Sequence, residues 1–350
     1  MLYSARLMKA GKLPQALLAS LLSRLPPDPR LLLGPGVGRD AAAIDLGDGR
    51  VLVAKTDPVT FATDRIGRYA VNVNANDIAC LGARPSWFMA TVLLPEGATP
   101  ELAEAIFEQV RSACDELGIV PVGGHTEITI GLDRPIIAGA MLGETTADAL
   151  VRPDGARAGD HVLLTKGLAI EGTALLARDA PGALRASSVP DTVIDAAARL
   201  LDRPGISVVR DAHTACATGH VHALHDPTEG GLATALEELA LAAHLSMTVR
   251  TEEIAVLPET DAVCTALELD PLGLLASGAL LIAVSDAGCD AVLTAIRAEG
   301  IEVACIGTLA SLERAGIIED ARTHTPLPRF ERDELARFLE TLSGEEGERQ

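Results

Sequence analysis

The chain has 350 residues, of which 48% are hydrophobic and 22% charged, a balance typical of a globular protein with more than one sizeable core. Its formal net charge of −20 excludes a surface built for nucleic acid or for an anionic membrane, because phosphate groups would be repelled at long range. A nucleotide is still compatible with this charge, because a bound metal ion can reverse the sign of the field locally.

The cysteines and the hydropathy favour a cytoplasmic location. The six cysteines are scattered without a CxxC pair, which argues against a disulfide framework or a zinc knuckle and favours small buried thiols in a reducing compartment. No apolar run is long enough to span a membrane. Near the N-terminus, four leucines at every fourth position predict an amphipathic helix that covers the core, rather than a signal peptide. These are Leu13, Leu17, Leu21 and Leu25.

Two short apolar segments at 41–46 and 50–55 flank a Gly-Asp-Gly turn and predict a β-hairpin. Counting outward from the turn places Asp40 opposite Asp57. Carboxylates that face each other across two strands repel by roughly 0.2–1 kcal/mol. A divalent cation would remove that cost, and Mg²⁺ is usually held by one or two carboxylates together with substrate phosphates. The alternative is two solvated aspartates at the end of a strand.

Residues 36–41, GVGRDA, fit the dinucleotide pattern G-x-G-x-x-G/A, and Asp57 follows at the distance of its ribose-binding acid. The context does not fit, because residues 31–33 make a poor first strand and no crossover helix has room before Asp57. A Walker motif is also excluded, since no Gly-Lys-Ser/Thr follows. We therefore expect Gly36 and Gly38 to belong to a loop whose backbone amides cradle an anion.

Residues 65–83 predict a helix that ends at Gly82, and residues 99–118 predict a second helix that begins at Thr99-Pro100. The first helix is unusual because it carries four polar residues that are poor helix formers. These are Asn72, Asn74, Asn76 and Asp77. They indicate either a polar site that contacts metal-bound water or substrate, or a partly buried helix with satisfied amides.

The motif GGHTE at 123–127 follows a predicted short strand, and residues 134–144 predict another strand. Gly123 and Gly124 would allow a ligand to approach the backbone closely. His125 and Thr126 are expected at the carboxyl edge of the strand, where sites of α/β proteins form. A structural hydrogen-bonding role for His125 fits the pattern equally well.

The polar segment 152–160 is the predicted domain boundary, and strands and helices alternate on both sides of it, which indicates two α/β domains. Beyond it, Lys166 ends a strand and could meet a phosphate. Asp226 and Thr228 precede a long helix over 228–244, where they could cap the helix or help to bind an anion. A core strand is expected within 274–284. The histidines at 213, 220, 222 and 225 match no zinc spacing.

Seven motifs, in this order along the chain, resemble one superfamily of proteins. They are GPGVGRDAA (34–42), TDP (56–58), NANDIACLGARP (74–85), GGHTE (123–127), ARAGD (156–160), TKG with AIEGT (165–173) and DPTEGGLATALEELA (226–240). The superfamily contains aminoimidazole ribonucleotide (AIR) synthase, thiamine-monophosphate kinase, selenophosphate synthetase and the hydrogenase-maturation carbamoyl dehydratase. The resemblance is strongest to the carbamoyl dehydratases and to AIR synthase-related proteins.

The resemblance implies a two-domain, PurM-like α/β fold. A helical extension would cover residues 1–33, an ATP- and Mg²⁺-binding domain 34–150, a C-terminal domain 151–320, and a helix with a charged tail 321–350. It also implies a homodimer in which strands of the two N-terminal domains join into a barrel.

The resemblance further implies ATP and Mg²⁺ as cofactors. By motif, Asp40, Asp57 and Asp77 would hold Mg²⁺, with Asn74 and Asn76 ordering the metal's surroundings. The loop with Gly36 and Gly38 would lie over the phosphates, and Gly123, Gly124 and Thr126 would approach the nucleotide. Lys166, Asp226 and His125 would act in the substrate cleft.

The function implied is ATP-dependent activation of a substrate oxygen, of amide or carboxamide type, by phosphoryl transfer in metallocentre maturation. The substrate would be a small molecule or borne on a protein, and a maturation protein could be a partner. The alternatives are a small-molecule kinase like thiamine-monophosphate kinase and a non-catalytic nucleotide-binding maturation partner.

The chain departs from the dehydratase pattern in several places. It ends in GEEGERQ where those enzymes carry a terminal cysteine, so the usual self-modification is not expected. It has Glu229 in place of an arginine, Ser277 in place of a glutamate and His125 in place of an aspartate. These differences leave the substrate open.

Overall fold

The computed structural model describes residues 13–36, 38–60, 62, 64–311, 316 and 318–348. In the first half it has β1 (Leu31–Leu33), β2 (Ala42–Gly47), β3 (Arg50–Val59), β4 (Arg84–Pro95), β5 (Val120–Thr129), β6 (Ile136–Thr146), α1 (Gln15–Leu22), α2 (Ile66–Cys80) and α3 (Pro100–Leu117). In the second half the strands are β7 (His161–Thr165), β8 (Val221–His225), β9 (Ser246–Val249), β10 (Leu281–Val284), β11 (Val303–Ala310) and β12 (Ile318–Asp320). The helices there are α4 (Ile170–Asp179), α5 (Pro181–Ala186), α6 (Asp191–Ala198), α7 (Val209–Ala217), α8 (Gly231–Ala242), α9 (Pro258–Leu267), α10 (Cys289–Ala298) and α11 (Glu334–Glu348).

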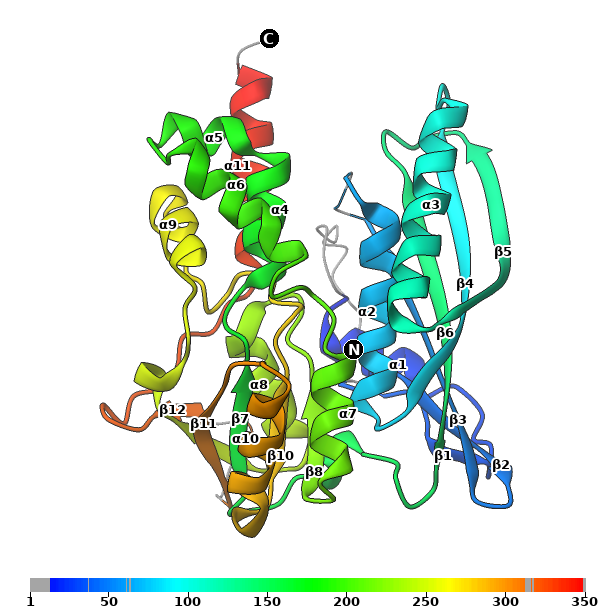
Figure 1. The fold of residues 1–350 in the computed structure, drawn as a ribbon, viewed down its shortest axis with the longest axis vertical. Coiled ribbons are helices and arrows are strands. Elements are labelled where there is room, and N and C mark those ends of the chain that lie inside the picture. Colours follow the sequence, from blue (N-terminus) through cyan, green and yellow to red (C-terminus); the bar gives the residue numbers. More distant parts are fainter. Residues whose placement is uncertain are drawn as a thin grey trace.

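The first sheet has the strand order β1-β2-β3-β6-β4-β5, and all neighbours are antiparallel except β4 and β5. Helices α2 and α3 cover one face of it (Figure 1). Two glycines of β6 let α2 approach closely. A Cβ atom on Gly139 would lie 2.4 Å from Asn74 Nδ2, and one on Gly143 would lie 2.3 Å from Ile78 Cγ2. Larger residues at these positions would push the helix off the sheet.

Helix α2 lies at the centre of the molecule. Thirteen of its fifteen residues are buried, because one side packs on the first sheet and another contacts α7 and β8 of the second half. One hydrophobic cluster therefore runs from the first sheet through α2 into the second half, where it includes Val208, Leu224 and Ile282. Polar side chains on such a helix must find partners inside the protein.

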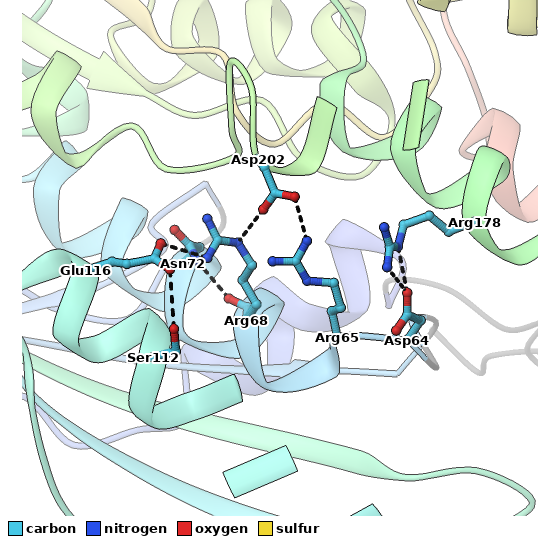
Figure 2. Close-up of polar contacts among 8 residues, drawn as sticks. All are labelled: Asp64, Arg65, Arg68, Asn72, Ser112, Glu116, Arg178 and Asp202. Atoms are coloured by element: carbon cyan, nitrogen blue, oxygen red, sulfur yellow. Dashed lines mark hydrogen bonds and ion pairs between the residues drawn. The ribbon is translucent and has the colours of Figure 1, made fainter. Parts of the chain in front are cut away.

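Ion pairs at the beginning of α2 also join the two halves (Figure 2). Asp202 of the second half accepts from Arg65 at 2.7 Å and lies 3.5 Å from Arg68, whose guanidinium also contacts Glu116. On the other side, Arg178 Nε of α4 donates to Asp64 at 2.7 Å. These contacts hold the start of α2 against the second half, beside the packing of α2 on α7.

The second sheet has the order β12-β9-β11-β7-β10-β8, with the pair β9 and β12 parallel and the other neighbours antiparallel. All four residues of β10 are buried, as expected for a strand in the interior of a covered sheet. Helices α4, α5, α6 and α9 gather above one end of this sheet (Figure 1). The two-domain α/β class is confirmed, whereas the exact domain limits stay a prediction.

The two helices predicted for residues 65–83 and 99–118 are confirmed. In the second half, the cap of α8 differs from the prediction. Helix α2 ends just before Gly82, which has a positive φ, and α3 is capped by Thr99, whose hydroxyl accepts from the Leu102 N–H. Helix α8 instead begins after Gly230, and neither Asp226 nor Thr228 caps it through its side chain. The expected N-capping role of these two residues is therefore wrong.

The hairpin register differs from the count by one residue. Gly47 pairs with Arg50 as expected, but the register shifts between Asp45 and Gly47, and beyond the shift Ala42 pairs with Ala54. A β-bulge next to the turn causes the shift. Asp40 lies outside β2 and is therefore not a cross-strand partner of Asp57.

Four further expectations about strands and helices are wrong. Residues 31–33 do form an edge strand, β1, although no crossover helix follows it. GGHTE does not follow a strand but lies within the long exposed strand β5. Of the run 274–284 only residues 281–284 are strand, and three of the N-terminal leucines are largely exposed rather than set on the core. Among the described residues, no helix is both long and apolar enough to cross a membrane.

Candidate functional site

An acidic cavity of about 270 Å³ lies where the two halves meet. It is formed by β3 and α2 from the first half and by α4 and the loops before α8 and β10 from the second. Six carboxyl groups and one ammonium group line it. They are Asp40, Asp57, Asp77, Glu171, Asp226 and Glu229, with Lys55 as the basic residue. A bound cation would stabilise such an excess of negative charge in a confined space.

Lys55 lies within this acidic cavity. Its Nζ is 2.8 Å from Asp77 Oδ2 and 3.3 Å from Asp57 Oδ2, and its side chain is only 10% exposed. Burial by itself would lower the pKa of Lys55, but the attraction of Asp77, Asp57 and Asp40 outweighs burial and raises it above its usual value. Lys55 and Asp57 face the same way because alternate residues of a strand share a face.

Asp226 and Asp77 are buried carboxyls with raised pKa values. Burial raises the pKa of Asp226 to about 6, and the nearby Asp40 adds to the shift, whereas His225 opposes it. The pKa of Asp77 is raised by burial and by Asp226, with Lys55 opposing. His225 lies 3.7 Å from Asp40 and 3.0 Å from Glu238. Burial disfavours its charged form, yet Glu238, Asp40 and Asp226 raise its pKa to about 9.

Glu171, in the first turn of α4, is a further buried acid in this cavity. Burial raises its pKa to about 7, with a hydrogen bond from Ser277 opposing the shift. A carboxyl group with a pKa near neutrality can hold or release a proton under ordinary conditions, which is the property required of a general acid or base.

The chemistry of the cavity fits Mg²⁺. Mg²⁺ prefers carboxylate oxygens, and six carboxyl groups share this cavity with one lysine. In addition, the buried Oδ2 of Asp226 has no hydrogen-bond partner within the described part of the chain. A buried oxygen without a donor is stabilised by a metal ion or by metal-bound water.

The asparagines of α2 hold the backbone around the acidic cavity and do not line it. Asn74 Nδ2 donates to the carbonyls of Asp57 and Ala70, which fixes the strand next to the Asp57 carboxylate. Asn76 is fully buried; its amide donates to the Ile206 carbonyl at 2.9 Å and accepts from the Val208 N–H at 2.8 Å. Asn72 donates to the Arg68 carbonyl. For Asn72 and Asn76 these contacts favour satisfied amides, whereas the buried Oδ1 of Asn74 has no hydrogen-bond partner within the described part of the chain.

The structure separates the other candidate residues into different places. Gly36 and Gly38 lie in the loop between β1 and β2 that leads to Asp40; Gly38 has φ of +72°. Gly123, Gly124, His125 and Thr126 line a second cavity of about 600 Å³ between α3 and β4–β5. A Cβ atom on Gly124 would lie 2.0 Å from the Ala90 carbonyl oxygen, so strand packing alone requires this glycine. His125 Nε2 lies 3.1 Å from Glu127 on the exposed strand.

Lys166 lies in a third cavity, of about 680 Å³, and not in the acidic one. Its Nζ donates to the Ser207 carbonyl at 2.6 Å and is 3.4 Å from Asp211. Burial lowers its pKa, with Asp211 opposing. The histidines at 213, 222 and 225 contact separate partners, namely the Ala83 carbonyl, Asp160 and Glu238, rather than a shared site.

Sequence reasoning missed Lys55, Glu171 and Glu229 as members of the site. Lys55 could have been found, because it lies two residues before Asp57 on a predicted strand and therefore shares its face. Glu171 and Glu229 lie in motifs already noted, but the contact between the two halves that brings them to Asp57 and Asp77 leaves no local signal.

Comparison with known proteins agrees with this arrangement. The model of the AIR synthase related protein N-terminal domain matches residues 38–145, and that of the C-terminal domain matches residues 157–318. Carbamoyl dehydratase HypE of Rhizobium leguminosarum bv. viciae is 32% identical over 279 residues, covering 77% of this chain and 76% of the relative. A selenide, water dikinase of Paraburkholderia xenovorans is 30% identical over 339 residues, covering 86% and 91%.

Solved structures are similar as well. The hydrogenase maturation protein HypE in complex with ATP has a TM-score of 0.68 at 26% identity, covering 85% of this chain and 89% of that one. A protein from Thermus thermophilus named tt0281 has a TM-score of 0.74 at 22% identity, covering 93% and 100%. Because the two family models together cover most of the sequence, the chain belongs to the AIR synthase-related family.

Proposed function

We propose that this chain is a Mg²⁺- and ATP-dependent enzyme that activates a substrate oxygen by phosphoryl transfer. The observation that carries the proposal is the cavity between the two halves, where six carboxyl groups face a single lysine. A site for Mg²⁺ and a triphosphate needs this concentration of oxygen ligands, since phosphoryl transfer depends on placement and on charge stabilisation. The solved HypE structure in complex with ATP supports ATP as the nucleotide.

In this proposal Asp40, Asp57 and Asp77 hold Mg²⁺, and Asp226 orients the surrounding water. Bound Mg²⁺ would neutralise the phosphates and position the one that is transferred. Lys55 orients Asp57 and Asp77 through its two ion pairs. Glu171, whose pKa is about 7, exchanges a proton with the substrate group that is activated.

The substrate class that fits best is an amide or carboxamide. Glu171 and Glu229 line the same cavity, and a neutral amide oxygen can enter beside them without adding negative charge. The 32% identical relatives named carbamoyl dehydratase support this choice. A kinase of the thiamine-monophosphate type remains the alternative outcome of the assay below.

We further propose that the protein is a homodimer that pairs through β5. This strand is at the end of the sheet. It exposes three apolar side chains, and the residue just after it exposes a fourth, each at least half exposed. They are Val120, Val122, Ile128 and Ile130. An exposed apolar edge strand is normally covered by a partner. Within one chain, the cavity lined by Gly123, Gly124 and Thr126 is separate from the acidic cavity. In this proposal, these residues would therefore reach a nucleotide only in the acidic cavity of the partner chain, across the interface.

A maturation protein is the proposed macromolecular partner. A relative from Methanocaldococcus jannaschii, 27% identical over 290 residues, is named a putative hydrogenase expression/formation protein. That name supports a role in metallocentre assembly, with the carboxamide borne on a protein or on a small molecule.

Turnover of ATP tests the proposal. The purified chain is incubated with Mg²⁺-ATP and, in separate reactions, with a carbamoylated thiol or with a small phosphate ester. Release of ADP that depends on the carbamoylated thiol supports amide activation, and ADP release with the phosphate ester alone favours the kinase. ATP binding without turnover in either reaction would mean a non-catalytic role. Glu171→Gln should reduce turnover while ATP binding persists, and equal turnover would refute the role of Glu171.

A further inference from the structure

Three side chains of metal-binding type meet in the second half, and none of them lines the acidic cavity. They are His161 at the start of β7, Cys289 at the start of α10 and Cys305 in β11. One ligand atom of each lies within 4.8 Å of the others. The sequence gives no hint of the group, since the three residues are far apart in the chain and no CxxC pair is present.

The sheet brings two of the three together. Strands β7 and β11 are antiparallel, with Thr308 opposite His161 and Cys305 opposite Leu163. His161 and Leu163 share a face, so Cys305 is a diagonal neighbour of His161 on that face. The register shifts between Cys305 and Gly307, which marks a bulge at this point. Cys289 completes the group as the first residue of α10.

The hydrogen bonds of His161 prepare its other nitrogen for a metal. Nε2 lies 2.8 Å from an Asp286 carboxylate oxygen, and a carboxylate there accepts the Nε2 proton. Nδ1 then carries the lone pair, and it lies 3.6 Å from Cys305 Sγ. A carboxylate that orients the imidazole in this way is the usual support of a metal-binding histidine.

The spacing fits a tetrahedral ion. In a tetrahedral zinc site the metal–sulfur distance is about 2.3 Å and the metal–nitrogen distance about 2.0 Å, so the sulfur and nitrogen ligand atoms lie about 3.5 Å from each other. The separation of 3.6 Å between His161 Nδ1 and Cys305 Sγ matches that value. Arg250 Nη2 lies 3.2 Å from Cys305 Sγ and donates to it.

We propose that His161, Cys289 and Cys305 bind one thiophilic divalent cation, with Zn²⁺ as the reference ion. Binding would release the protons of the two thiols to solvent, and a water molecule would take the fourth position. Solvent reaches the group, since the His161 side chain is 27% exposed and both cysteines are half-buried. The proposal is independent of the acidic cavity.

Zinc titration of the full-length protein tests the proposal. The chain is stripped with a chelator under a phosphine reductant, and Zn²⁺ is added against a chromophoric indicator. We expect one Zn²⁺ per chain, lost in Cys289→Ser and in Cys305→Ser. Cys216→Ser serves as the matched control, because Cys216 is a half-buried thiol outside the group. Zinc should also protect Cys289 and Cys305, but not Cys216, from alkylation, as read by mass spectrometry.

A second variant keeps the test decisive if the cysteine variants fail to fold. Asp286→Asn changes a side chain that is 88% exposed and should leave the fold intact, while weakening Zn²⁺ binding about 10–100-fold. Co²⁺ should give a thiolate charge-transfer band that Cys305→Ser abolishes. The proposal is overturned if the reduced chain binds no Zn²⁺, if binding is unchanged in Asp286→Asn and in both cysteine variants, or if the two cysteines form only a disulfide.

Discussion

Asn76 is the side chain whose loss should reveal how firmly α2 is tied to the second half. Asn76→Ala removes a fully buried amide that donates to the Ile206 carbonyl and accepts from the Val208 N–H, at 2.9 and 2.8 Å. Both partners lie in the segment before α7, and they are themselves buried. The substitution therefore leaves one buried donor and one buried acceptor unsatisfied.

The magnitude follows from these two groups. Each unsatisfied buried backbone group costs about 1–3 kcal/mol, and partial relaxation or an entering water would reduce the sum. We expect a loss of about 2–4 kcal/mol in the free energy of unfolding, which is roughly a 30- to 1000-fold shift toward the unfolded state. Asn72→Ala is the matched control, because among the described residues Asn72 donates only to the Arg68 carbonyl one turn away. Asn72→Ala should lower the free energy of unfolding by about 1 kcal/mol or less.

Urea unfolding followed by circular dichroism measures both variants. Asn76→Ala should lower the midpoint clearly more than Asn72→Ala, with the slope unchanged if only stability has changed. The reasoning would be refuted if the two variants lost equal stability. It would also be refuted if Asn76→Ala lost less than about 1 kcal/mol, since a single hydrogen bond is worth about that much.

Three further predictions concern the acidic cavity and the packing of α2. Lys55→Met should lower the melting temperature in EDTA, because Asp57 and Asp77 lose the ammonium group that pairs with them. Added Mg²⁺ should then raise the melting temperature of this variant more than that of the parent. Equal increases with Mg²⁺ in the two proteins would contradict the metal site. Gly139→Ala should lower the free energy of unfolding in urea by about 1–3 kcal/mol, because its Cβ would meet Asn74. Gly182→Ala is the control and should lower it by nothing, because the space around Gly182 is open. Equal effects of the two substitutions would refute the packing argument. The folded Glu171 keeps its proton up to about pH 7 and the unfolded one loses it near 4.5, so the folded state binds more protons in that window and its stability falls as pH rises. In metal-free buffer, Glu171→Gln should therefore gain stability relative to the parent from pH 4.5 to pH 7, and parallel pH profiles would contradict the raised pKa.

The local features of the fold could be predicted from the sequence. Thr99 and Gly118 set the ends of α3, and Gly82 follows the end of α2, because those signals act within a few residues of the helix end. The hairpin was found as well, but its register was wrong by one. A bulge next to Gly47, which has a positive φ, shifts the pairing, and a regular count from the turn does not include it.

The site could be predicted only in part, because most of its geometry comes from contacts between distant segments. Asp57 and Asp77 were recognised, yet the partner of Asn76 lies about 130 residues away and could not be read from the helix. Likewise, Lys166 looked like a phosphate ligand at the end of its strand, but it turns toward Ser207 and Asp211. Burial and the meeting of the two halves decide these outcomes.

Calorimetric titration of ATP into the full chain tests the central claim most directly. The Asp57 carboxylate is 36% exposed and pairs only with Lys55 among the described residues, so Asp57→Asn should fold normally. The account predicts that the parent binds ATP in the presence of Mg²⁺, that EDTA abolishes binding, and that Asp57→Asn binds more weakly at the same Mg²⁺ concentration. Absence of ATP binding by the parent, or equal binding by Asp57→Asn, would contradict it.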